Sequence, residues 1–228
     1  KFENLDQLKS KIQNLKLPFV WKCTEFGYDG NGVKIVRQAD DLNNLPNVEC
    51  IAEEMVPFKN ELAVIVCRNP SGEIKTYPVV EMEFHPEANQ VEMFQTENDE
   101  ILVNEVAPRP HNSGHYSIEA SYTSQFENHL RAILDLPLGN TDSKVAGIMV
   151  NLTGAEGFSG EVIYENIEAI LGWNGVTPHI YGKKQTRPLR KMGHVTIVNE
   201  NIGEARRIAE DVKNTIRVIS PPTPEGGV

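Results

Sequence analysis

Two acidic side chains interrupt apolar segments in the middle of the chain. Glu92 stands in the run Val-Glu-Met-Phe, and Glu105 follows Asn104 at the end of a second apolar run. An unpaired charge within a strand is costly, so both acids need a partner. If the two runs pair as a hairpin, both carboxylates face one cleft, where hard oxygen ligands suit a magnesium ion that also holds phosphate oxygens. A salt-bridged pair is an equal alternative.

A segment rich in hydrogen-bond donors follows directly, at residues 107–116. Pro108 and Pro110 stiffen it, and it carries Arg109, His111, Asn112, Ser113 and His115. We expect an anion or substrate site here rather than packing. Residues 181–191 add five cations to an acidic chain, among them Lys183 and Arg190. They make either a solvated basic turn or the positive field beside a substrate phosphate.

A glycine-rich loop lies near the start, at residues 27–32. Its three glycines let the backbone approach a ligand and point N–H groups at phosphate oxygens. Lys22, five residues earlier on an expected strand, would add a point charge. A plain hairpin turn is the alternative, because Asp-Gly and Asn-Gly are the commonest hairpin dipeptides.

A third polar stretch, residues 53–56, precedes Glu61. Its backbone groups suit the edge of a flat base, and the Glu61 carboxylate can accept hydrogen bonds from two sugar hydroxyls. The same residues also fit the solvated edge of a strand.

The elements that must position these residues are mixed. Helical spacing of apolar residues predicts helices at residues 2–15, 40–45, 122–134 and 202–216. Strands are expected at residues 19–22, 33–37, 50–56, 61–68, 74–80, 91–95, 101–106, 145–152 and 194–198. Turns at residues 69–72 and 97–99 predict two hairpins. Strands predominate in the middle and no repeat is present, so the class is α+β. The tail, residues 221–228, is expected to be disordered.

Composition limits the classes of protein. The 228 residues carry a net charge of −10, so neither nucleic acid nor an anionic membrane is expected as a partner. The three cysteines are an odd number and far apart, which predicts reduced thiols in a cytoplasmic protein. The chain begins with Lys1 rather than Met, and the amphipathic helical pattern is already under way at Phe2. We therefore expect the chain to be part of a longer protein.

Four motifs resemble one known family. Residues 104–116, the pattern Gly27-Tyr28-Asp29-Gly30-x-Gly32, residues 124–132 and residues 190–196 are similar to the signatures of N5-carboxyaminoimidazole ribonucleotide synthases. The resemblance covers residues 17–198. It implies an ATP-grasp fold with a small β-rich C-terminal domain, and a carbon–nitrogen ligase that forms a homodimer. Such a ligase uses ATP and bicarbonate, through carboxyphosphate, to carboxylate 5-aminoimidazole ribonucleotide in purine biosynthesis, with Mg²⁺ or Mn²⁺ as the metal.

The resemblance also implies roles for individual residues. ATP would be bound by Lys22, Gly27, Tyr28, Asp29, Gly30, Asn31, Gly32, Val33, Glu53, Glu54, Met55, Val56, Glu61, His85, Asn104 and Glu105. The metal would be held by Glu92 and Glu105. Bicarbonate or carboxyphosphate would be surrounded by Arg109, His111 and Lys183. The aminoimidazole ribonucleotide would be held by Tyr28, Asp29, Asn112, Ser113, Lys183 and Arg190.

The chain departs from the family pattern at three points. The family's N-terminal α/β domain is absent, the segment between Val80 and Glu92 is short, and Asn31 stands where many relatives have Lys or Arg. We expect an ATP-grasp small subdomain at residues 1–60, a large subdomain at 61–143 and a C-terminal domain at 144–220.

Two other functions remain open. A formate-dependent glycinamide ribonucleotide formyltransferase shares Pro-Arg-Pro-His, but Asn112 and His115 favour the carboxylase. A truncated nucleotide-binding remnant without turnover would explain the missing domain, but it has no need of both metal ligands.

Overall fold

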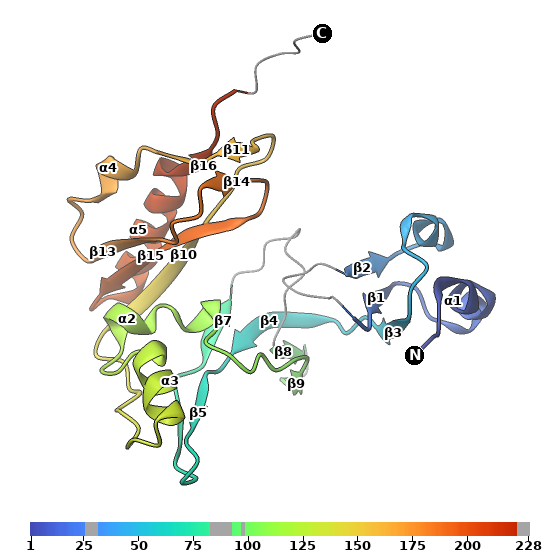
Figure 1. Ribbon diagram of the computed structural model, residues 1–228, viewed down its shortest axis with the longest axis horizontal. Coiled ribbons are helices and arrows are strands. Elements are labelled where there is room, and N and C mark those ends of the chain that lie inside the picture. The colour runs from blue at the N-terminus through green and yellow to red at the C-terminus, as the bar shows by residue number, and fades with distance from the viewer. Residues whose placement is uncertain (26–31, 83–92, 97–98, 223–228) are drawn as a thin grey trace. The chain divides into compact units, whose positions relative to one another are not determined.

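The computed structural model describes residues 1–25, 32–82, 93–96 and 99–222 of the chain. These form two compact units, each made of two chain segments. Unit 1 comprises Lys1–Ala63 and Glu81–Val106, and unit 2 comprises Val64–Val80 and Ala107–Val228. Each unit combines antiparallel sheets with helices (Figure 1), so the predicted α+β class is confirmed.

A three-stranded sheet in the order β2-β1-β3 opens unit 1. Its strands are β1 (Phe19–Cys23), β2 (Val33–Val36) and β3 (Cys50–Glu54). The expected N-terminal helix packs on it as α1 (Leu5–Lys11) and the 3₁₀ turn η1 (Ile12–Asn14), and the expected short helix is the 3₁₀ turn η2 (Ala39–Asn44). Leu5 and Leu8, three residues apart, share one helix face and form a core with Phe19 and Trp21.

This sheet has a packed face and a second face, because side chains alternate along each strand. Phe19 and Trp21 lie in the core with α1. Val20 and Lys22 therefore point to the other side, where Val33 lies opposite Lys22 across the β1–β2 pair.

The second sheet of unit 1 has the order β7-β4-β8-β9. Its strands are β4 (Phe58–Ala63), β7 (Val80–Met82), β8 (Met93–Thr96) and β9 (Ile101–Val103). β8 and β9 pair antiparallel with Met93 opposite Val103, which confirms this predicted hairpin. Its turn residues 97–98 lie outside the described part of the chain.

Two of the predicted strands are each interrupted in the structure. The run 61–68 is not continuous, because β4 ends at Ala63 in unit 1 and β5 begins at Val66 in unit 2. The run 74–80 is also broken, since β6 ends at Thr76 and β7 begins only at Val80. Pro78 lies in that gap and has no N–H to donate to a ladder.

Unit 2 is built around a sheet in the order β10-β15-β13. Its strands are β10 (Ala146–Thr153), β13 (Val176–Ile180) and β15 (Lys191–Asn199). The central strand β15 is buried over six consecutive residues, from Met192 to Ile197, because it is covered on both faces. Helix α5 (Ile202–Thr215) runs along one face (Figure 1). The short helix α2 (Ser117–Ala120) packs on the other, so closely that a Cβ on Gly147 would lie 2.6 Å from Ala120 Cβ.

Smaller elements complete unit 2. The predicted hairpin at residues 69–72 joins β5 (Val66–Arg68) to β6 (Ile74–Thr76). The helix expected at 122–134 is α3 (Gln125–Ile133), and a 3₁₀ turn, η3 (Asn112–Gly114), precedes α2. The remaining elements are the strand pairs β11 (Gly160–Glu161) with β14 (Gln185–Thr186) and β12 (Ile163–Glu165) with β16 (Arg217–Ile219), and helix α4 (Ile167–Ile170).

Candidate active site

Lys22 contacts two polar side chains on the second face of the β2-β1-β3 sheet in unit 1, the face opposite α1. Its Nζ lies 2.6 Å from Glu53 Oε2 on β3 and donates a hydrogen bond of 3.1 Å to Asn104 Oδ1, directly after β9. Three of the residues predicted to contact the nucleotide thus meet, although Lys22 and Asn104 are 82 positions apart. A part-exposed ion pair of this kind contributes only about 0–1 kcal/mol, so a phosphate oxygen can take the place of Glu53 at little cost.

Apolar side chains surround Lys22 on the same face. Val20 and Lys22 alternate with the core residues of β1, and Val33, Ile35 and Ile51 lie opposite them on the neighbouring strands. All four apolar residues are half-buried. A half-buried apolar surface beside a cation is suited to a flat base whose phosphates reach the cation. Of these four, only Val33 was expected at the site.

The other predicted nucleotide ligands are scattered over unit 1. Glu54 and Met55 are exposed at and beyond the end of β3, and Val56 is half-buried. Glu61 in β4 is only 3% exposed. Glu105 is exposed, two residues beyond β9. Their roles stay predictions.

Several predicted residues lie outside the described part of the chain, namely Gly27, Tyr28, Asp29, Gly30, Asn31, His85 and Glu92. Among the described residues, no group of three or more His, Cys, Asp or Glu side chains is placed to hold a metal ion. The magnesium site therefore stays a prediction, and of its two expected ligands only Glu105 lies within the described residues.

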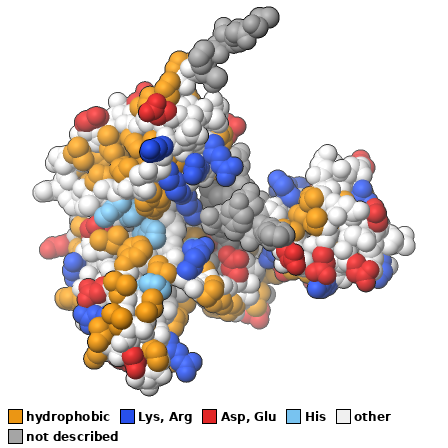
Figure 2. Space-filling model, in the orientation of Figure 1, with side chains coloured by type: hydrophobic (Ala, Val, Ile, Leu, Met, Phe, Trp, Pro, Cys, Tyr) orange, Lys and Arg blue, Asp and Glu red, His pale blue; other side chains and the backbone are white. Residues whose placement is uncertain are grey.

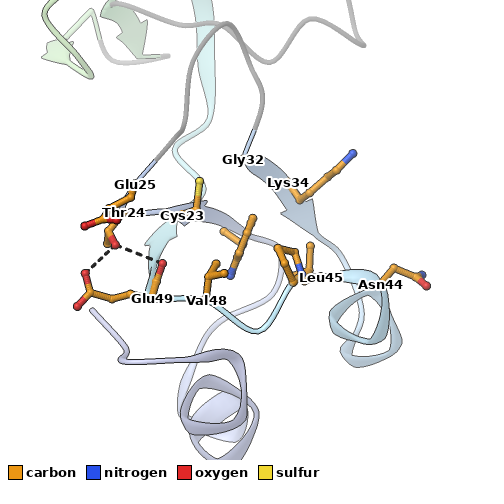
Figure 3. Close-up of a pocket in the computed structure, with 11 residues that line it drawn as sticks. Cys23, Thr24, Glu25, Gly32, Lys34, Asn44, Leu45, Val48 and Glu49 are labelled. Carbon is orange, nitrogen blue, oxygen red and sulfur yellow. Dashed lines mark hydrogen bonds between the residues drawn. The ribbon is translucent and has the colours of Figure 1, made fainter.

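A hollow of about 390 Å³ lies elsewhere in unit 1. Figure 3 shows it between Cys23, Leu45 and Val48, with Thr24 donating to Glu49 nearby. Trp21, which lines the hollow, belongs to the packed face of the sheet. The hollow is therefore separate from the face that carries Lys22.

In unit 2, the donor-rich segment forms an ordered loop that ends in η3. The His111 ring nitrogen Nδ1 lies 3.0 Å from the Ser113 hydroxyl. The Asn112 amide donates to Asn151 Oδ1 on β10 at 2.9 Å, which ties the loop to the sheet. Arg109 is exposed, with its guanidinium donating to its neighbour Pro110 O.

Tyr181, directly after β13, brings two predicted substrate ligands together. Burial raises the pKa of its hydroxyl, and the Asn112 side chain beside it opposes part of that rise. Lys183 Nζ lies 5.6 Å from the centre of the Tyr181 ring and donates to Lys191 O at 2.6 Å. Residues from two separate motifs therefore converge here.

The basic cluster surrounds β14. It consists of Lys183, Lys184, Arg187, Arg190 and Lys191, and Figure 2 shows Lys and Arg side chains gathered on this part of unit 2. The Arg190 guanidinium donates to Gln185 O at 2.8 Å, so one of its terminal nitrogens is held by the backbone.

Behind the loop, a row of polar side chains crosses the sheet. His194 lies opposite Asn151 on β10 and opposite His179 on β13. The His179 and His194 rings stack with centroids 4.4 Å apart, and the Tyr181 hydroxyl lies 2.9 Å from His194 Nδ1. Burial, with the neighbouring His179 and His115, lowers the pKa of His194 to about 3. The imidazole is therefore neutral at pH 7.

Comparison with known proteins identifies two family domains in the chain. The model of the ATP-grasp domain matches residues 1–87 and 88–126, and the model of the phosphoribosylaminoimidazole carboxylase C-terminal domain matches residues 147–208. The crystal structure of N5-carboxyaminoimidazole ribonucleotide synthetase from Thermotoga maritima superposes with a TM-score of 0.83. At 40% identity, the match covers 96% of this chain and 68% of that one.

The chain belongs to the N5-carboxyaminoimidazole ribonucleotide synthase family.

Other members of the synthase family support this assignment. The Bacillus subtilis N5-carboxyaminoimidazole ribonucleotide synthase is 38% identical over 233 residues, covering 86% of this chain and 60% of that protein. The Aspergillus clavatus synthase, solved in complex with ADP and 5-aminoimidazole ribonucleotide, is 29% identical with a TM-score of 0.76, covering 92% of this chain and 66% of that one. This chain thus spans about three fifths of the length of the Bacillus relative.

The predicted fold, an ATP-grasp domain followed by the C-terminal domain of the synthase family, is confirmed. The predicted domain boundaries stay a prediction. No helix within the described residues is long and apolar enough to cross a membrane.

Sequence reasoning did not name two kinds of residue that lie beside the predicted ones. The apolar neighbours of Lys22 could have been found from strand alternation, since Val20 is two positions before Lys22. Gln125 and His194 lie inside motifs that had been recognised, but only the structure shows that both are buried against the loop, at 2% exposure each.

Proposed function

We propose that the protein containing this chain carboxylates 5-aminoimidazole ribonucleotide, using ATP and bicarbonate. The observation that supports this most is that, in a chain of the synthase family, Lys183 Nζ lies 5.6 Å from the centre of the Tyr181 ring, with the Asn112 side chain near the Tyr181 hydroxyl. An amide and a cation side by side suit a substrate that carries both a heterocycle and a phosphate. The Aspergillus clavatus relative, crystallised with ADP and 5-aminoimidazole ribonucleotide, supports the same substrate.

The reaction has three steps. A bicarbonate oxygen attacks the γ-phosphorus of ATP and the bond to ADP breaks, giving carboxyphosphate. The carboxyphosphate C–O bond then breaks to give carbon dioxide and phosphate. The substrate amine attacks the carbon of carbon dioxide and loses a proton. The protein's work is to position the reactants and exclude water, since phosphoryl transfer needs little covalent help.

Unit 1 supplies the nucleotide-binding residues in this proposal. Lys22 and Asn104 contact the phosphates, residues 53–56 border the adenine, and Glu61 accepts from the ribose. The carboxylates of Glu92 and Glu105 would hold a magnesium ion, since this metal prefers oxygen ligands. Such an ion, when bound, offsets the charge on the transferred phosphoryl group.

Unit 2 supplies the substrate side. Arg109, His111 and Lys183 provide the positive charge and donors for bicarbonate and carboxyphosphate. Asn112 and Ser113 contact the aminoimidazole, while Arg190 contacts the ribonucleotide phosphate through the part of its guanidinium that does not bond Gln185.

The test is ADP release by the protein that contains this chain. We expect ADP only when aminoimidazole ribonucleotide and bicarbonate are both present. Glu105→Gln removes one of the charges expected to hold magnesium, and should lower kcat at least about 100-fold while the protein stays folded. ADP release driven by formate and glycinamide ribonucleotide instead would overturn the proposal. Unchanged kcat in Glu105→Gln would remove that residue from the metal site.

The homodimer implied by the family is also part of this proposal. α3 and its flanks carry an apolar surface on unit 2, visible in Figure 2, with Tyr122, Leu130, Ile133 and Leu134 each at least 60% exposed. An exposed apolar surface of this kind marks an association site, and a second copy of the chain is the partner we propose. The three cysteines are all free thiols, which fits the cytoplasmic location that we propose.

A further inference from the structure

The buried amide of Gln125 holds the main chain of the donor-rich loop. Gln125 is the first residue of α3, and its side chain is 2% exposed. Its Oε1 accepts from His111 N at 2.9 Å, and its Nε2 donates to His111 O at 2.7 Å. The side chain therefore pairs with both polar groups of one backbone residue, as a neighbouring strand would.

The second N–H of the same amide reaches His115. Gln125 Nε2 lies 2.7 Å from His115 Nδ1. Because His111 N and O fix which end of the amide is nitrogen, Nε2 must be the donor and Nδ1 the acceptor. His115 is thus neutral with its proton on Nε2. Burial and the nearby His111, Lys191 and His179 lower the pKa of His115 to about 4, in agreement with a neutral ring.

Two further contacts close the arrangement. Gln125 N donates to Ser117 Oγ at 2.9 Å, and that hydroxyl donates to Gly114 O at 2.6 Å. A Cβ at Gly114 would lie 2.7 Å from Gln125 Oε1, so the amide reaches His111 only because residue 114 is glycine. Every polar contact of Gln125 is therefore directed at the segment 111–117.

We propose that Gln125 is a positioning residue, whose amide sets where His111, Asn112 and Ser113 present their side chains to the substrate. The inference rests on the proposed function of those three residues. A buried amide whose hydrogen-bonding groups all serve one loop is costly to leave unpaired, so it selects a single loop conformation. Gln125 touches no reactant in this role.

The test uses two isosteric variants of the whole protein. Gln125→Glu keeps the shape but removes both N–H donors, and Gln125→Met removes both polar ends. We expect kcat for ADP release with aminoimidazole ribonucleotide to fall about 10- to 100-fold, the scale of a small misplacement. ATP affinity should not change, because the residues proposed to bind ATP lie in unit 1. Glu127→Gln, an exposed position on the same helix, is the matched control and should behave as the wild type.

A second measurement does not depend on turnover. ¹⁵N NMR of His115 should show an unprotonated Nδ1 in the wild type, and a protonated Nδ1 or a broken contact in Gln125→Glu. Gly114→Ala, which displaces the amide from the other side, should reproduce the loss of kcat if the Gln125 variants do not fold. Wild-type kcat in Gln125→Met with an unchanged His115 ring would overturn the inference. Absence of aminoimidazole-dependent ADP release in the wild type would instead overturn the proposed function, while the NMR result would still decide whether Gln125 holds His115.

Discussion

The imidazole of His194 lies between His179 and Asn151 on the inner strand of unit 2 and is 2% exposed. Its pKa is lowered to about 3, mainly by burial, whereas an unfolded histidine titrates near about 6.5. Between these values the unfolded state binds one more proton than the folded state. The free energy of unfolding therefore falls as the pH is lowered through that window.

At the residue scale, this predicts a pH-dependent stability that a substitution can flatten. His194→Gln removes the titrating ring, so its free energy of unfolding should decline less steeply between pH 6.5 and pH 4.5, by up to about 1.4 kcal/mol per pH unit. Denaturant melts across this pH range measure the slope. His129→Gln, exposed on α3, serves as the control and should run parallel to the wild type. Parallel curves for His194→Gln would contradict the buried, neutral state of this ring.

Sequence reasoning at this scale selected three residues that the structure places in direct contact. Lys22, Glu53 and Asn104 were each expected to contact the nucleotide, and Lys22 contacts both of the others, while their role stays a prediction. Gln125 could not be found in this way, because a glutamine at the start of a helix is unremarkable. Its importance comes from burial against His111, which is 14 positions earlier in the chain.

At the element scale, helix α5 begins with a well-formed cap. Asn201 Oδ1 accepts from Gly203 N at 2.8 Å and from Glu204 N at 3.2 Å. These bonds satisfy N–H groups that have no partner within the helix. The helix then packs Ala205 and Val212 on the sheet, so the cap stabilises the core of unit 2 as well as the helix end.

The cap gives a prediction with an internal control. Asn201→Ala should lower the free energy of unfolding by about 1 kcal/mol, and Asn201→Gly by only a few tenths, because glycine leaves the first turn open to water. Chemical denaturation of the two variants side by side measures the difference. Wild-type stability in Asn201→Ala would mean that the side-chain bonds to Gly203 and Glu204 do not stabilise the helix.

Element prediction failed where the three-dimensional neighbours decide the outcome. β13 was not predicted, and Pro178 stands in its middle. The strand tolerates proline since it lies at the edge of the sheet, and edge position cannot be read from one sequence. Nothing in the apolar run at 61–68 indicates that Ala63 and Val66 belong to different sheets. The segments before and after the break both show the residue pattern of a strand.

At the scale of the whole molecule, the apolar surface on α3 is the feature that predicts an assembly. Leu130→Glu places a charge at a residue that is 60% exposed. In a monomer such a change is nearly neutral, but within an apolar contact between two copies it buries an unpaired charge. We expect the wild type to sediment as a dimer and Leu130→Glu as a monomer. Lys144→Glu, outside this surface, is the control. A wild-type monomer, or a dimer unaffected by Leu130→Glu, would contradict the proposed partner.

The chain leaves unit 1 after Ala63, contributes a hairpin to unit 2, and returns at Glu81. During synthesis, β4 therefore emerges from the ribosome before its sheet neighbours β7 and β8 exist. The first 63 residues cannot complete their second sheet, and the hairpin that follows must wait for residues beyond Val106. A nascent chain interrupted between these points exposes an unpaired strand edge, which is the kind of surface through which incomplete chains associate.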